Sequence, residues 1–61
     1  MNRTEAITKA AHDASFLIGA LRALCADATP LEMLVLEGLI REAMTINQRL
    51  AILAETRRGA A

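Results

Sequence analysis

The stretch "DATPLE", residues 27–32, decides the fold, because it holds the only proline of the chain and separates two long apolar segments. Thr29 is a favourable helix N-cap, and Pro30 suits the first position of a helix. Glu32 follows Thr29 by three residues, which completes the spacing of a capping box. The stretch therefore predicts that one helix ends and a second one begins here.

The outer ends of the two predicted helices also carry recognisable signals. Asn2 and Glu5 repeat the capping spacing near the N-terminus. Gly59 stands where a glycine commonly terminates a helix. The sequence predicts helices over about residues 3–27 and 30–57.

Both segments carry apolar residues at alternating spacings of three and four, which is typical of helices that pack at shallow angles. The row in the first helix consists of Ile7, Ala10, Ala14, Leu17, Leu21, Leu24 and Ala28, flanked by Ala11, Ile18 and Cys25. The row in the second consists of Leu36, Leu39, Ala43, Ile46, Leu50 and Leu53, flanked by Met33, Ile40, Asn47 and Ala54. The short link favours an antiparallel helical hairpin. We therefore predict an all-α fold with a single domain over residues 1–61.

The breadth of these apolar rows predicts a second copy of the chain. Two helices packed only on each other bury too little apolar surface to offset the entropy of ordering 61 residues. A homodimeric four-helix bundle gives each helix two neighbours. The predicted dimer core consists of Leu17, Leu21, Leu24, Leu36, Leu39, Ile40, Ile46, Leu50 and Leu53.

Several apolar or small residues near the link fall outside this core. They are Phe16, Gly19, Ala23, Leu31, Leu34 and Val35. One interpretation is that the helices bow there and bury these residues in a thicker core. The other is that they form an apolar, turn-proximal face that binds a partner protein, since clustered exposed apolar residues mark interaction sites.

Composition narrows the classes of function. Seven basic and seven acidic residues cancel, so the charge supports neither a nucleic-acid nor a membrane-surface partner. The longest apolar run without a charge, residues 14–21, is far shorter than the ~20 residues of a membrane span. The N-terminal residues lack the apolar core of a signal peptide, and the single cysteine excludes an internal disulfide. These features predict a cytoplasmic location.

The residues capable of chemistry are few and scattered. No nucleophile–base pair, glycine-rich phosphate loop or metal-ligand cluster is present in the sequence, so we expect neither an enzyme nor a bound cofactor or metal. His12 is expected on the surface and Cys25 as a packed thiol. Asn47 stands at the edge of an apolar row, where it either fixes the pairing of helices or bonds to water.

Length, capped turn and heptad spacing together resemble small phage and bacterial helical-hairpin proteins, including anti-activators that bind a host transcription factor. The resemblance covers the whole chain. It implies a small protein-binding regulator or inhibitor. A related alternative is an antitoxin-like subunit whose apolar face is covered by a cognate chain.

The size and the position of the turn also resemble the Rop-type RNA-binding bundle. In that family the first helices contact RNA through basic and polar side chains around a phenylalanine. The resemblance implies that Lys9, Arg22 and Phe16 contact RNA in this way, with His12 nearby. The zero net charge departs from the basic field that RNA binding requires.

Overall fold

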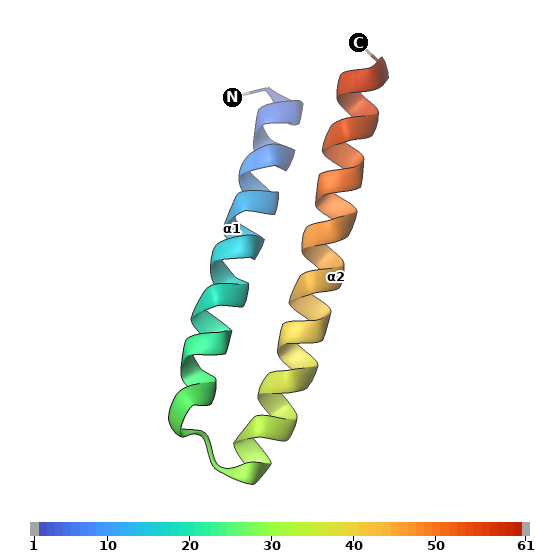
Figure 1. Ribbon diagram of the computed structural model, residues 1–61. Coiled ribbons are helices and arrows are strands. Elements are labelled where there is room, and N and C mark those ends of the chain that lie inside the picture. Colours follow the sequence, from blue (N-terminus) through green and yellow to red (C-terminus); the bar gives the residue numbers. More distant parts are fainter. Residues whose placement is uncertain (1, 61) are drawn as a thin grey trace.

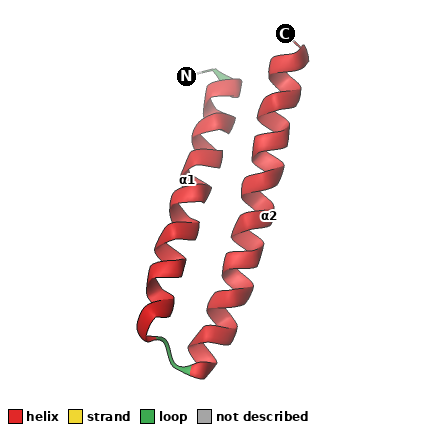
Figure 2. Ribbon diagram, viewed as in Figure 1, coloured by secondary structure: helices red, strands yellow, loops and turns green. Residues whose placement is uncertain are grey.

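The computed structural model describes residues 2–60, and the side chains of residues 2–59. The all-α prediction is confirmed: the described chain consists of α1 (Arg3–Leu24), a short 3₁₀ helix η1 (Cys25–Asp27) and α2 (Pro30–Ala60) (Figure 2). The two long helices lie side by side and run in opposite directions, with the link at one end and both termini at the other (Figure 1). The helix pair measures 47 × 17 × 11 Å between its outermost Cα positions.

Both predicted N-terminal caps are confirmed. The Glu5 N–H donates to the side-chain oxygen of Asn2 at 2.7 Å. At the link, the Thr29 N–H donates to the Glu32 carboxylate at 2.8 Å, and the Glu32 N–H donates to Thr29 Oγ1 at 3.2 Å. This reciprocal pair satisfies two backbone donors that a helix start otherwise leaves without partners.

The predicted helix ends need two corrections. The first helix is α-helical only to Leu24, because its last turn tightens into η1, as helix C-termini often do. The prediction that Gly59 terminates the second helix is wrong, since α2 continues to Ala60. Termination by glycine relies on the left-handed conformation, and no residue within 2–60 has a positive φ.

The capping box at the link makes a prediction about stability and pH. Replacing Thr29 with alanine is expected to destabilise the protein by about 1 kcal/mol, because the Glu32 N–H loses its acceptor. Hydrogen bonds to the Thr29 backbone and side chain lower the pKa of the Glu32 carboxyl. Its contribution to stability is therefore complete above the pKa of an unfolded glutamate and is lost as pH falls through the lower folded pKa.

Thermal unfolding of wild type, Thr29→Ala and Glu32→Gln, followed by circular dichroism, checks both effects. The stability difference between wild type and Glu32→Gln should shrink as pH is lowered from about 7 to about 3. A difference that stays constant over this range would show that the carboxylate does not stabilise the helix start.

Contact between α1 and α2 follows one row of mostly apolar side chains on each helix, in which alanines alternate with larger residues. Among residues 2–59, only Ala43 and Ala54 are buried, at 6% and 5% exposure. Half-buried residues recur on both sides at spacings of three and four: Ile7, Ala11, Ala14, Ile18 and Leu21 on α1, continued by Cys25 in η1, and Met33, Leu36, Ile40, Asn47 and Leu50 on α2. The contact row thus includes the residues that the sequence placed at the flanks, such as Ile18 and Ile40.

Asn47 joins the two helices directly. Its side-chain amide donates to the backbone oxygen of Ala11 at 2.6 Å, in a half-buried position. A polar side chain with a specific acceptor inside an apolar row fixes how two helices are aligned. This hydrogen bond supports a role of Asn47 in aligning α1 and α2 within one chain.

Candidate interaction site

The helix pair divides the nine predicted dimer-core residues into two sets. Leu21, Leu36, Ile40 and Leu50 are half-buried along the contact row. The other five are exposed and define what we call the apolar side: Leu17, Leu24, Leu39, Ile46 and Leu53, with exposures between 45% and 60%.

The five exposed residues lie on the same side of the pair. Leu17 and Leu24 are one heptad apart on α1, and Leu39, Ile46 and Leu53 are one heptad apart on α2, so each set lies along one line of its helix. A shallow groove of about 330 Å³ runs between the two lines. It is lined by Ala14, Leu17, Leu21, Leu39, Glu42, Ala43 and Ile46. The apolar side thus contains an open groove, and Glu42 is the single charged residue that lines this groove.

The opposite side of the pair is polar. Its groove, of about 540 Å³, is lined by Ser15, Ile18, Arg22, Arg41, Met44, Thr45, Asn47 and Gln48. Arg22 crosses this side to the sulfur of Met44 at 3.8 Å, and near the open end Arg58 donates to Thr8 Oγ1 at 3.4 Å. The two sides therefore differ in polarity, although both helices contribute residues to each side.

All six residues predicted to bind a partner are exposed, but they form two patches. Phe16, Gly19 and Ala23 form the α1 patch, and Leu31, Leu34 and Val35 form the α2 patch. Phe16 is 83% exposed and Leu34 is 69% exposed. At 100° per residue, Ala23 lies on the face of α1 opposite Ala14 of the contact row, and Leu34 lies on the face of α2 opposite Ala43, so the two patches face apart. One chain does not join them into a single surface.

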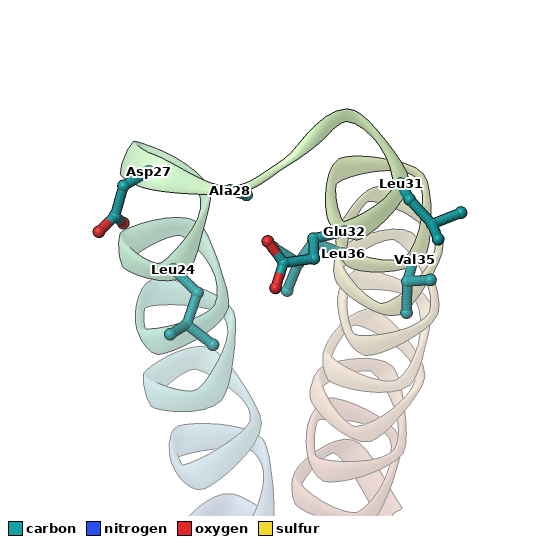
Figure 3. A pocket seen from close by; sticks show the side chains of 7 residues that line it. All are labelled: Leu24, Asp27, Ala28, Leu31, Glu32, Val35 and Leu36. Carbon is teal, nitrogen blue, oxygen red and sulfur yellow. The ribbon is translucent and has the colours of Figure 1, made fainter.

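A concavity at the link extends the α2 patch toward the apolar side. It has a volume of about 540 Å³ and is lined by Leu24, Asp27, Ala28, Leu31, Glu32, Val35 and Leu36 (Figure 3). Leu31 and Val35 lie next to each other along α2, whereas Glu32 and Leu36 project toward α1. The sequence assigned Leu24 only to the core and missed this second location. The position of Leu24, one helical turn before the link, could have predicted this second location.

The residues with potential chemistry remain separate in the structure. His12 is exposed and Cys25 is half-buried, with its thiol 3.5 Å from the Leu21 backbone oxygen. Within residues 2–60, no three His, Cys, Asp or Glu side chains gather as metal ligands, and neither helix has a stretch apolar enough to cross a bilayer.

The basic residues of the Rop-type alternative are already engaged within the chain. Lys9 forms an ion pair with Asp13 at 2.9 Å. Arg22 rests against Met44, as described above. Phosphate binding by these side chains would have to compete with those contacts.

Comparison with known proteins gives no relative from which a role could be carried over. The chain matches no protein-family model, no curated protein and no solved structure. Its function must therefore be argued from the surfaces of the helix pair.

Proposed function

We propose that this chain is a small homodimeric regulator that docks on another protein through its exposed apolar patches near the link and alters the activity of that protein. The observation that carries the proposal is the exposure of Phe16 at 83%, together with that of Leu31 at 73% and Leu34 at 69%. Clustered apolar side chains in water mark interaction sites, and a single aromatic residue often anchors the contact. The concavity beside Leu31 and Val35 offers a partner side chain a place to enter.

The proposal includes a dimeric four-helix bundle built from two helical hairpins. The proposal is supported by the small amount of apolar surface that a single helix pair buries. Among the described residues only Ala43 and Ala54 are buried, while eleven large apolar side chains remain exposed. A second copy would cover a large part of this surface and give each helix a second neighbour.

Docking is tested by changing one apolar residue in each patch. Immobilised wild-type protein should retain a bacterial protein that Phe16→Glu or Leu34→Glu no longer retains, with at least a tenfold loss, because a buried carboxylate in an apolar contact is unfavourable. Ile52→Glu is the matched control, since Ile52 is also exposed, at 58%, but lies in the half of α2 away from the link. Retained proteins are compared by mass spectrometry.

Two results would contradict docking through these patches. Identical retained proteins for wild type and both variants would show that the patches bind nothing specific. Unfolding of the Phe16→Glu or Leu34→Glu protein, seen by circular dichroism, would show that the residue belongs to the core. RNA binding by wild type that weakens steeply with salt would instead favour the Rop-type alternative.

A further inference from the structure

The apolar side of the helix pair differs from the partner patches in position and in composition. We propose that a second copy of this chain covers the apolar side, and that Arg49 forms an ion pair across this contact with an acidic residue of the second copy. This inference rests on the proposed homodimer. It adds which side of the pair is buried and which charge borders it.

The broad side of the helix pair, on which the apolar side lies, is large enough for a stable dimer interface. The helix pair is 47 Å long and 17 Å wide, which gives its broad side a footprint of about 800 Å². Standard protein interfaces bury about 800 Å² on each partner. A second copy fits this footprint without overhang, because it has the same dimensions.

Charge selects the apolar side over the opposite one. The polar side presents Arg22 and Arg41 beside its groove. Two copies that met through that side would bring guanidinium groups together and remove them from water, which is unfavourable on both counts. The groove of the apolar side holds only Glu42 as a charged residue, and this carboxylate is exposed at its edge.

Arg49 borders the same edge and forms no ion pair with another residue of the range 2–59. It follows Glu42 by one heptad, so both lie along one line of α2. The ion pairs within residues 2–59 are Lys9 with Asp13 and Arg58 with Glu55. Glu42 and Arg49 are therefore an unpaired acid and an unpaired base beside an uncovered apolar groove.

Each two-fold arrangement of the dimer places an acid opposite Arg49. If α1 packs on α2 of the second copy, Asp13 comes within reach of Arg49. The Asn47–Ala11 hydrogen bond sets Asn47 and Ala11 at one height, so Arg49 and Asp13, each two residues further in opposite directions, lie about 6 Å apart along the pair, a distance that the long arginine side chain spans. If α2 packs on α2 of the second copy, Glu42 meets Arg49, because their midpoint lies near the centre of α2 (Pro30–Ala60). Two-fold symmetry forms the pair twice in either case.

The test is sedimentation equilibrium of the full chain at several concentrations. Leu17→Glu and Ile46→Glu should raise the dimer dissociation constant at least tenfold, because each places a carboxylate in the apolar contact. Ile52→Glu, which changes an exposed residue away from the apolar side, should leave it close to the wild-type value. Arg49→Glu should raise it about tenfold by setting acid against acid.

Charge exchange identifies the pair and remains informative if a variant of the apolar side does not fold, since the exchanged residues lie on the surface. Combining Arg49→Glu with either Asp13→Arg or Glu42→Arg should restore the wild-type dissociation constant, and the combination that does so identifies the arrangement. Two results would contradict this inference while leaving the homodimer in place. The dimer dissociation constant could stay unchanged in Leu17→Glu and Ile46→Glu, or neither charge-exchange combination could restore it. A monomeric wild type overturns the proposed homodimer as well.

Discussion

Replacing Ala43 with leucine is expected to destabilise the protein by about 1–3 kcal/mol, because the longer side chain forces closely packed helices apart. Ala43 is 6% exposed and lies near the middle of α2, where the two helices are in contact. Ala43 is nearly covered by α1, so the added isopropyl group either pushes α1 away or turns into the groove that Ala43 lines and displaces neighbouring side chains from their preferred rotamers. Chemical denaturation followed by circular dichroism measures the change.

Ala51→Leu is the matched control for this substitution. Ala51 is an exposed alanine on the same helix, so its replacement keeps helix propensity and adds the same volume in open water. Its free energy of unfolding should differ from wild type by less than about 0.5 kcal/mol. Equal effects at both positions would show that Ala43 is not a point of close contact between the helices.

Dilution of the protein is expected to lower its stability by at least as much as the Ala43→Leu substitution. If folding requires a second copy, each tenfold dilution lowers the stability of the dimer by about 1.4 kcal/mol, so a thousandfold dilution lowers it by about 4 kcal/mol. The physical reason is that unfolding releases two chains, whose entropy grows as concentration falls. Melting temperature measured from submicromolar to millimolar protein should therefore rise continuously with concentration.

A control distinguishes association from other effects of concentration. A Leu17→Glu protein that no longer associates should lose helical signal at low temperature and show no dependence of melting on concentration. Cooperative wild-type melting curves that coincide across the whole range would establish a stably folded single chain. That result would contradict the proposed homodimer and every assignment of residues to its interface.

The local elements of this protein were predictable because they depend on neighbouring residues. Thr29, Pro30 and Glu32 form the capping box that their spacing predicts, and the N-terminal cap at Asn2 forms in the same way. The end of α2 was not predictable from Gly59 alone, since glycine permits termination without requiring it.

The candidate surfaces were predictable only in part. Phe16 and Leu34 fall outside the apolar rows, which left a thicker core and an exposed face as alternatives, and both residues are exposed in the helix pair. Their separation into two patches does not follow from either helix alone, because the direction in which a patch faces depends on where the other helix lies.

Capping and periodicity are properties of a single segment, so the two capped helices and the broad apolar stripe on each of them follow from the amino-acid sequence alone. Only the tertiary structure decided which part of each stripe faces the other helix. A helix with a broad stripe can bury different parts of it by rotating about its axis. Here the small side chains of Ala43 and Ala54 and the hydrogen bond from Asn47 to Ala11 fix the rotation. That rotation leaves Leu17, Leu24 and their counterparts on α2 exposed along the apolar side.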